Sequence, residues 1–349
     1  MIREVSGNLL TADADALVNT VNTVGVMGKG IALQFKRAYP AMFEDYARAA
    51  KAGDVVRGRM HVWPTGSMTG PRYVINFPTK GHWRAPSRLP DIEAGLVDLI
   101  RVVRELQLRS IAIPPLGAGS GGLNWRDVEP LIRRAFEGVA EVEVLLYPPG
   151  APPRASEMPD TTELPRMTLG RAALITLLTQ YSRFALSASP IEAQKLMYFL
   201  QEAGEPLRLR YSKHLYGPYA DNLRHVLREI EGHYLSGYGD GSARVTEAEP
   251  IEVLPGAEAA AQRELGEAAP TRERIRRVLE LAEGFESMYG MELLATVHWV
   301  AKHESAATHS PEAASRLVHE WSPRKKDMFT ARHVEIAWKA LHDKGWIAA

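Results

Sequence analysis

The chain has 349 residues, 45% of them apolar and 24% charged, which is ordinary for globular proteins and long enough for two domains that each bury a core. It contains no cysteine, which excludes disulfides, thiolate zinc sites and cysteine nucleophiles. It also has no run of about 18 apolar residues, so no membrane-spanning helix is predicted. The net charge is zero, but residues 1–155 hold 19 Lys and Arg against 15 Asp and Glu, and the remaining residues hold 23 against 27. This charge difference is compatible with a polyanionic ligand for the first part of the chain and a basic partner for the second part. A difference this small also arises by chance.

Strand-like and helix-like patterns alternate in the first part of the chain. Short β-rich runs are followed by residues with apolar positions three and four apart, in the order 16–22, 30–50, 73–78, 89–107, 110–116, 127–138 and 142–148. This alternation predicts a parallel or mixed sheet covered by helices. In such sheets ligands bind beyond the carboxyl ends of the strands, so we expect the segments after 16–22, 73–78 and 110–116 to converge on one crevice.

A proline-rich stretch at 147–165 favours extended chain and separates two parts of different character. We place the first domain at 1–155, a linker at 156–168 and a mainly helical domain at 169–349. Apolar residues three and four apart predict helices in this last part over 169–186, 190–204, 219–232, 271–287, 291–304 and 332–345. The Gly-, Ala- and Glu-rich interval 237–269 is interpreted as a long loop or a small hairpin.

Two glycine-rich segments follow predicted strands and precede predicted helices. The first glycine segment is residues 25–30 and the second is residues 117–122. Glycines let the backbone approach a ligand closely, and a helix N-terminus behind them favours an anion. Either segment alone is more often a simple turn, and neither has the spacing of a P-loop. Together in one crevice they predict a grip on a diphosphate.

Three polar side chains stand near the predicted crevice. Asn19 and Asn22 end the strand before the first glycine segment, where an amide can bridge ribose hydroxyls or simply cap the loop backbone. Lys80 follows the next strand, where an amine can act as a point charge or a nucleophile. A lone lysine is more often a solvated surface ammonium, so this pattern alone does not establish a catalytic site.

Three segments of the first domain carry a more specific pattern: VNTVNTVGVMGKGIALQFK, NFPTKGHWRAPSRLPDIEAGL and IPPLGAGSGGLNW. They resemble the macrodomain family, in particular its branch of terminal ADP-ribose glycohydrolases, and the resemblance covers nearly all of residues 1–150. It implies a three-layer α/β/α fold with a mixed central sheet, followed here by the mainly helical domain. It also implies an ADP-ribose site formed by Asn8, Leu9, Asn19, Asn22, Met27, Gly28, Lys29, Gly30, Ile31, Thr79, Gly117, Ala118, Gly119, Ser120, Gly121, Gly122 and Tyr147.

The start of the chain departs from this family at the adenine end of the ligand. Many macrodomains begin with Gly-Asp-Ile-Thr, whose aspartate reads the adenine amine, whereas this chain has Gly-Asn-Leu-Leu at residues 7–10. The resemblance places Asn8 at the base and Tyr147 as a stacking platform. Adenine selectivity does not follow from it.

Lys80 matches the lysine that the glycohydrolase branch uses catalytically, so we expect Lys80 to be the catalytic residue. Some members pair this lysine with an aspartate in the second glycine segment, but here the nearest matching position is Gly121 and no carboxylate occurs between Leu116 and Trp125. Uncharged, Lys80 could attack the anomeric carbon or trap a ring-opened ribose as a Schiff base; charged, it could stabilise an anionic leaving group. The sequence leaves both mechanisms open.

The second part contains QKLMYFLQEAGEPLRLRYSKHLYGPYADNLRHVL and EGHYLSGYGDG. These strings resemble the C-terminal domain of the DarG antitoxin family, clearly over residues 169–240. The resemblance implies that the first domain removes ADP-ribose attached to thymine bases of single-stranded DNA by a DarT-like toxin, and that the second domain binds that toxin. Without it, the aromatic residues and histidines of this region are expected to serve packing rather than base stacking or metal binding: Tyr198, Phe199, Tyr211, Tyr216, Tyr219, His214 and His225.

We therefore predict a DNA ADP-ribosyl glycohydrolase that is also an antitoxin, with no cofactor, metal or membrane association. The N-terminus lacks the basic start of an export signal, so we expect a soluble, cytoplasmic protein. His82, Arg84 and Arg88 are candidate DNA contacts, although surface solvation is the commoner role of such residues. Two alternatives stay open: a module that binds ADP-ribose without catalysis, and a hydrolase of ADP-ribosylated protein carboxylates.

Overall fold

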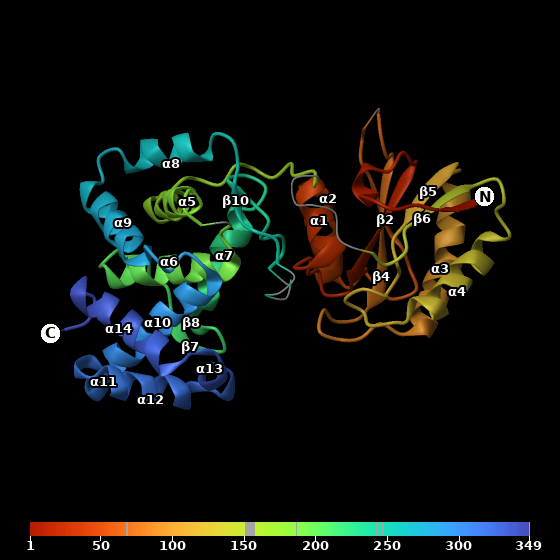
Figure 1. The fold of residues 1–349 in the computed structure, drawn as a ribbon. Helices are drawn as coiled ribbons and strands as arrows, with labels where there is room; N and C mark the ends of the chain where they lie inside the picture. Colours follow the sequence, from red (N-terminus) through yellow and green to blue (C-terminus); the bar gives the residue numbers. More distant parts are fainter. Residues whose placement is uncertain are drawn as a thin grey trace. The chain divides into compact units, whose positions relative to one another are not determined.

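The computed structural model describes residues 1–67, 69–150, 158–185, 187–241, 243, 245 and 248–348 (Figure 1). The chain divides into two compact units, Met1–Glu163 and Leu164–Ala349. The linker that the sequence predicts at 156–168 is shared between them, and its residues 156 and 157 lie outside the described part of the chain. No helix among the described residues combines the length and the apolarity that crossing a membrane requires.

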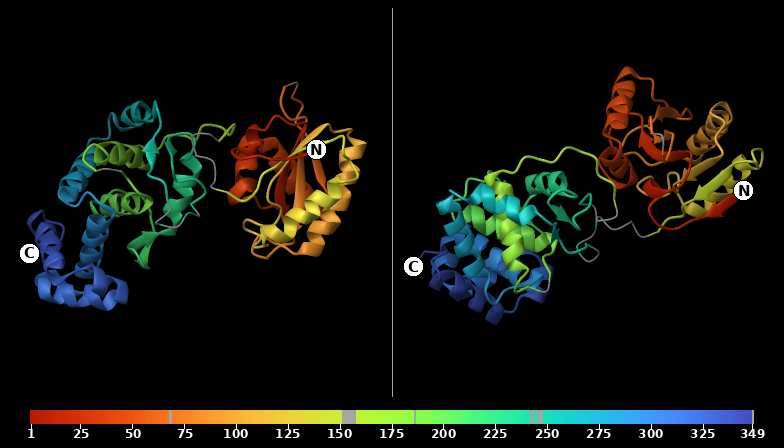
Figure 2. Two further views of the ribbon diagram at one scale, coloured as in Figure 1. Left: turned by 45° about the vertical axis from the view of Figure 1, so that its right-hand side comes forward. Right: turned by 90° about the horizontal axis from the view of Figure 1, so that it is seen from above.

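The first unit is a six-stranded sheet with helices on both faces, which confirms the predicted three-layer α/β/α fold (Figures 1 and 2). The strand order is β1-β6-β5-β2-β4-β3, and every neighbouring pair is parallel except β3 and β4, so the sheet is mixed. Its elements are β1 (Ile2–Glu4), η1 (Leu9–Thr11), β2 (Ala16–Asn22), α1 (Gly30–Ala38), α2 (Pro40–Ala52), β3 (His61–Pro64), β4 (Tyr73–Lys80), α3 (Leu89–Glu105), β5 (Ser110–Ile113), α4 (Trp125–Phe136) and β6 (Glu143–Leu146).

The central strand β2 explains why both faces of the sheet are covered. Successive side chains of a strand point to opposite faces. Leu17 and Val21 belong to the core shared with α1 and α2, whereas Ala16 and Val18 belong to the core shared with α3 and α4. A strand buried on both sides reads as a nearly continuous apolar run, which is how it appears in the sequence.

The structure differs from the sequence-based expectation at several element ends. The helical run expected over 30–50 is two helices, because Pro40 opens α2 and the preceding Tyr39 leaves the helical conformation (φ −137°, ψ 71°). The strand expected over 110–116 ends at Ile113, since the two prolines that follow have no N–H to donate. The edge strands β1 and β3 were not predicted.

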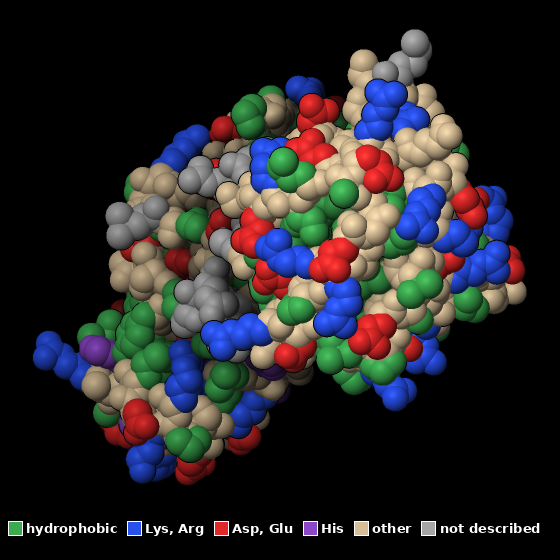
Figure 3. All heavy atoms as spheres, turned by 90° about the vertical axis from the view of Figure 1, so that its right-hand side faces the viewer, with side chains coloured by type: hydrophobic (Ala, Val, Ile, Leu, Met, Phe, Trp, Pro, Cys, Tyr) green, Lys and Arg blue, Asp and Glu red, His purple; other side chains and the backbone are tan. Residues whose placement is uncertain are grey.

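Charged side chains of both signs are interspersed on the side of the molecule seen in Figure 3, where α3 and α4 of Figure 1 face the viewer. A mixed surface of this kind produces no broad positive field. Contact between this face and a polyanion would therefore depend on a few individually placed cations.

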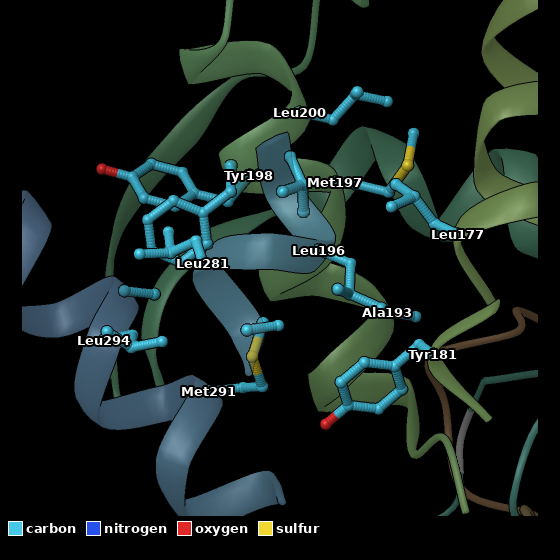
Figure 4. Packing of buried hydrophobic residues seen from close by; sticks show 14 of the residues in the cluster. Leu177, Tyr181, Ala193, Leu196, Met197, Tyr198, Leu200, Leu281, Met291 and Leu294 are labelled. Carbon is cyan, nitrogen blue, oxygen red and sulfur yellow. The ribbon is translucent and has the colours of Figure 1, made fainter. Parts of the chain in front are cut away.

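The second unit is mainly helical, as expected. Figure 4 shows its core, in which α5, α6, α9 and α10 bring together side chains such as Leu177, Leu196, Leu281 and Leu294. Its elements are α5 (Leu169–Tyr181), α6 (Pro190–Glu202), β7 (Tyr211–His214), β8 (Gly217–Ala220), α7 (Asp221–Ile230), β9 (Leu235–Ser236), β10 (Glu252–Val253), α8 (Ala257–Leu265), α9 (Ala269–Ala282), α10 (Met288–His303), α11 (Ser305–His309), α12 (Pro311–Trp321), α13 (Pro323–Met328) and α14 (Ala331–Asp343).

The interval 237–269 is more structured than a loop or hairpin. It contributes β10, which pairs antiparallel with β9, and the helix α8. The Ala and Glu residues that made this interval look irregular are good helix formers, and α8 uses them in AEAAAQREL. The short helices α11 to α13 and the β7–β8 hairpin were also not predicted.

A buried ion cluster ties α10 to α13 in the second unit. Glu292 is 1% exposed and accepts hydrogen bonds from the Lys325 ammonium at 2.7 Å and from both terminal nitrogens of Arg324 at 2.6 and 3.1 Å. Lys325 is itself completely buried. Burial alone would raise the pKa of the Glu292 carboxyl, but the hydrogen bonds and charges of these two cations hold it below its ordinary value.

Candidate active site

The first glycine segment, residues 25–30, connects β2 to α1. Asn22, at the end of β2, organises its backbone: the side-chain oxygen accepts from the Val24 N–H at 3.1 Å and the Val26 N–H at 3.3 Å, and the side-chain nitrogen donates to the Val26 carbonyl at 2.6 Å. Tyr46 donates its hydroxyl proton to the Asn22 carbonyl. The Asn22 amide therefore caps the loop, which was the alternative to a ribose contact.

The second glycine segment, residues 117–122, follows β5 and folds tightly on itself. Gly117 has φ +68° and its carbonyl accepts from the Leu123 N–H at 3.0 Å. A Cβ atom added at Gly121 would lie 2.9 Å from the Ser87 Cβ and closer still to the Ser87 hydroxyl and the Gly117 carbonyl oxygen. Real Cβ atoms do not come so close, so position 121 has no room for a side chain. The aspartate that the resemblance gives to some glycohydrolases in this segment therefore has no room at position 121.

Lys80 lies where these two segments meet, at the carboxyl end of β4. It stands beside Asn22 of β2 in the sheet, and its carbonyl accepts from the Thr23 N–H at 3.1 Å. Its ammonium donates to the Ser120 carbonyl of the second glycine segment at 3.1 Å. A Cβ atom at Gly30, in the first segment, would lie 3.9 Å from the Ser120 hydroxyl. The three segments that the sequence predicts to converge are thus in contact.

The Lys80 side chain is only partly buried, and this affects its ionisation. Removing an ammonium from water disfavours the charged form, so burial lowers the pKa of Lys80 below its ordinary value of 10.5. A lower pKa increases the share of neutral amine at a given pH. The environment is therefore compatible with both of the roles considered for this residue.

Asn19 lies deeper than expected and is not brought to the crevice. It is completely buried, and it donates to the Asn76 side-chain oxygen at 2.8 Å on the neighbouring strand β4. The Asn76 amide nitrogen in turn lies 3.1 Å from His61 Nδ1, and His61 Nε2 lies 3.3 Å from the Asp45 carboxylate. Asn19 is thus the inner end of a polar chain that crosses the sheet. Thr79 is likewise buried and hydrogen-bonds to a backbone carbonyl.

The residues expected at the adenine end gather around η1. Asn8 caps this short helix by accepting from the Leu10 N–H at 3.0 Å, and its amide nitrogen lies 3.5 Å from the Met158 sulfur. Leu9 and Tyr147 belong to one core cluster, against which Met158 packs. Burial raises the pKa of the Tyr147 hydroxyl. Met158, from the segment after the last strand, was not singled out from the sequence.

The remaining expected ADP-ribose residues lie on the two glycine segments. Met27 is buried, Gly28 and Ile31 are partly exposed, and Lys29 is the exposed N-cap residue of α1. In the second segment Gly119, Ser120 and Gly122 are exposed and Ala118 is partly exposed. Most of these residues are therefore at least partly exposed at the surface of the first unit.

The loop 81–88 borders Lys80 and carries the candidate DNA contacts. His82 and Arg84 are exposed, and the exposed Arg88 is the N-cap residue of α3. Beside this loop is an open hollow of about 450 Å³ lined by Thr23, Val55, Val56, Arg57 and Asp91. Arg57 forms an ion pair with Asp91 at 3.1 Å. Sequence reasoning missed Arg57, because nothing along the chain relates it to residue 80.

In the second unit, the aromatic residues divide into two groups. Tyr198 and Phe199 are buried in the core, as expected for packing. Tyr216 and Tyr219 are partly exposed and, with His214, line a pocket of about 140 Å³. His225 lies 2.8 Å from an Arg228 nitrogen. Across the described residues of both units, no three His, Asp or Glu side chains gather in an arrangement that could hold a metal ion.

Comparisons with known proteins agree with this architecture. The family model described as "Macro domain" matches residues 18–132. A relative from Mycobacterium tuberculosis named DNA ADP-ribosyl glycohydrolase is 46% identical over 97% of this chain and 98% of its own length. A protein from Thermosipho africanus named DNA ADP-ribosyl transferase–DNA ADP-ribosyl glycohydrolase fusion protein is 31% identical over 42% of this chain and 41% of its own.

Among solved structures, the macrodomain of Mycobacterium tuberculosis DarG is 60% identical and covers 43% of this chain and 99% of its own, with a TM-score of 0.43. The 46% identity to the curated relative extends over nearly the whole of both chains, including the helical second unit. The chain belongs to the DarG family of DNA ADP-ribosyl glycohydrolases.

Proposed function

We propose that this protein removes ADP-ribose from thymine bases of single-stranded DNA, with Lys80 as the catalytic residue. The observation that carries the proposal is the meeting of Lys80 with both glycine segments at the carboxyl ends of β2, β4 and β5. This edge of an α/β sheet is where ligands bind. The DNA substrate follows the name shared by relatives that align with nearly the whole chain.

The glycine segments supply the grip on ADP-ribose. Helix α1 starts at Gly30, directly after the first segment, and its N-terminus carries the positive end of the helix dipole. Backbone N–H groups of such a turn suit a diphosphate, as do those of the second segment. Lys29 adds an exposed cation at this point. The diphosphate would then lie between the two segments, with the distal ribose toward Lys80.

Lys80 acts in this scheme without a partner carboxylate in the second glycine segment, since position 121 admits no side chain. As a neutral amine it can attack the anomeric carbon, with the thymine ring nitrogen leaving with the bonding electrons and taking up a proton. Loss of the proton from the attached amine and opening of the ribose ring then give a Schiff base, which water hydrolyses to release ADP-ribose and the free amine. As an ammonium it can stabilise that departing base, which is a delocalised anion. Trapping with borohydride separates the two roles, because only a Schiff base formed by Lys80 would be reduced to a stable adduct.

The central test compares wild type with Lys80→Ala on an ADP-ribosylated single-stranded oligonucleotide. We expect the substitution to lower kcat by at least about a hundredfold, a typical loss for one group that acts in the transition state. Lys51→Ala, which removes an exposed lysine at the end of α2, serves as the matched control and should keep wild-type activity. Both variants should bind free ADP-ribose.

The alternatives make different predictions in this assay. A binding module without catalysis, which the absence of a carboxylate at position 121 favours, would bind ADP-ribose and leave the oligonucleotide label in place. A hydrolase of modified protein carboxylates would release ADP-ribose faster from a glutamyl-linked substrate than from the thymine-linked one. Either result would refute the proposed activity.

For the second unit we propose binding to a DarT-like toxin. The support is the fusion of transferase and glycohydrolase in the Thermosipho relative, together with the excess of acidic residues after residue 155. The full chain should co-purify with the toxin in a stoichiometric complex, and Lys80→Ala should not weaken that complex. Failure to form a complex even at low salt would refute this part of the proposal.

A further inference from the structure

Exposed apolar side chains occur in the segments next to Lys80. Val24, just before the first glycine segment, and Val26, within it, are 47% and 42% exposed, and Val56 and Trp83 are each 45% exposed. Val24 follows Thr23, whose N–H bonds to the Lys80 carbonyl, and Val56 lines the hollow that Thr23 also lines. Large apolar side chains held in water at the mouth of a crevice are typical of a binding surface.

Trp83 stands at the corner of a tight turn. The Ala85 N–H donates to the His82 carbonyl at 2.9 Å, which projects Trp83 and Arg84 outward. The His82 ring is stacked on the indole with 5.3 Å between centroids and 30° between planes, and the Arg84 guanidinium carbon lies 4.4 Å from the indole centroid. All three side chains are exposed. Together they form an exposed stack of flat groups, which a nucleobase can extend at its outer face.

This stack is held at a fixed place relative to Lys80. On one side, the Thr23 hydroxyl donates to the Gly81 carbonyl at 2.7 Å, which ties the start of the loop to the segment after β2. On the other side, the Ser87 N–H donates to the Gly121 carbonyl at 2.9 Å, which ties its end to the second glycine segment. Only the turn 82–85 projects between these two anchors.

We propose that the turn 82–85 is a stacking platform for an unmodified nucleobase that neighbours the modified thymine, with Trp83 at its centre. The inference rests on the proposed function and names the part of the DNA that the ADP-ribose site does not reach. The loop 81–88 starts directly after Lys80, so a strand whose modified thymine lies at Lys80 can continue past it. Stacking on an aromatic group is worth about 1–3 kcal/mol per base and tolerates any sequence.

Cationic side chains beside the platform are suited to the phosphates of the DNA strand. Arg84 belongs to the stack itself, and Arg57 lies next to Gly81, where an added Cβ atom would be 4.0 Å from the Arg57 Nε. Guanidinium groups are suited to backbone phosphates. An unpaired strand would thus find a base contact at the stack and phosphate contacts at these guanidinium groups.

The test uses the full chain and two substrates, ADP-ribosylated thymidine and an ADP-ribosylated single-stranded oligonucleotide. The variants are Trp83→Ala, Trp83→Phe and, as control, Val97→Ala, which shortens a 75% exposed side chain on α3. Trp83→Ala should raise KM for the oligonucleotide about tenfold and leave both kinetic constants for the nucleoside unchanged. Trp83→Phe should bring KM for the oligonucleotide most of the way back to the wild-type value. Val97→Ala should have the kinetic constants of wild type on both substrates.

Two results would overturn the platform. If Trp83→Ala raises KM equally for both substrates, Trp83 has a structural role. If KM for the oligonucleotide is unchanged, Trp83 makes no stacking contact with the DNA. If wild type hydrolyses neither substrate, the proposed function fails, but the platform is still decided by fluorescence anisotropy with the modified oligonucleotide. A roughly tenfold weaker affinity of Trp83→Ala than of wild type would then support it, and equal affinities would refute it.

Discussion

Gly121→Ala should damage the second glycine segment even though it adds only one methyl group. The new Cβ would stand 2.9 Å from the Ser87 Cβ and closer to the Ser87 hydroxyl and the Gly117 carbonyl oxygen. Ser87 cannot retreat freely, because its N–H is bonded to the Gly121 carbonyl at 2.9 Å, and the Gly117 carbonyl is held by the Leu123 N–H at 3.0 Å. Relief therefore requires the backbone to move.

Overpacking of this kind costs about 1–3 kcal/mol. For a unit of this size, each kcal/mol corresponds to a shift in Tm of roughly 2–4 °C. The assay is thermal unfolding of the full chain with and without ADP-ribose, since the transition that the ligand raises belongs to the first unit. We expect Gly121→Ala to lower that transition and to weaken ADP-ribose binding.

Gly119→Ala provides the matched control within the same segment. No atom lies within 4 Å of a Cβ added at Gly119, and its φ is not in the left-handed region. In the absence of ligand, this variant should unfold at the same temperature as wild type. The reasoning is refuted if Gly121→Ala is as stable as wild type and binds ADP-ribose with unchanged affinity. It is also refuted if Gly121→Ala and Gly119→Ala lower the unfolding temperature by the same amount.

Two further predictions concern ionisable groups. The pH profile of kcat/KM, which reports groups of the free enzyme, should show a limb assigned to Lys80 with a midpoint below 10.5, and this limb should be absent in Lys80→Arg. A rising limb identifies the neutral amine as the active form and a falling limb the ammonium. A midpoint at or above 10.5 contradicts the burial argument. Glu292→Gln should destabilise the second unit by about 3–5 kcal/mol, because it leaves two cations, one of them completely buried, without their counter-ion. Chemical denaturation would measure this loss, and Glu335→Gln, which breaks an exposed pair on α14, should change stability by less than about 1 kcal/mol.

The alternation of patterns in the first part of the chain was enough to predict the layers of the sheet and the meeting of Lys80 with the glycine segments. That prediction works because parallel strands carry their carboxyl ends to one edge. It does not give strand pairing, so the edge strands β1 and β3 were missed: β1 has three residues and β3 is four residues long and ends at Pro64. Edge strands of this kind carry little apolar periodicity.

Asn19 shows where reasoning along a single strand stops. From the sequence it is a polar residue near a strand end. Its position in register with Asn76 places both amides in the interior, where the Asn19 nitrogen donates to the Asn76 oxygen. Such a pairing depends on which strands are neighbours. Arg57 was missed for the related reason that its position beside Gly81 depends on how the loop before β3 returns to the sheet.

The loop 81–88 is anchored at both of its ends. Because Thr23 bonds to Gly81 and Ser87 to Gly121, the backbone that carries Trp83 is held on either side next to Lys80. If the platform takes a neighbouring base, recognition of the DNA would be confined to a short unpaired stretch beside the modified thymine.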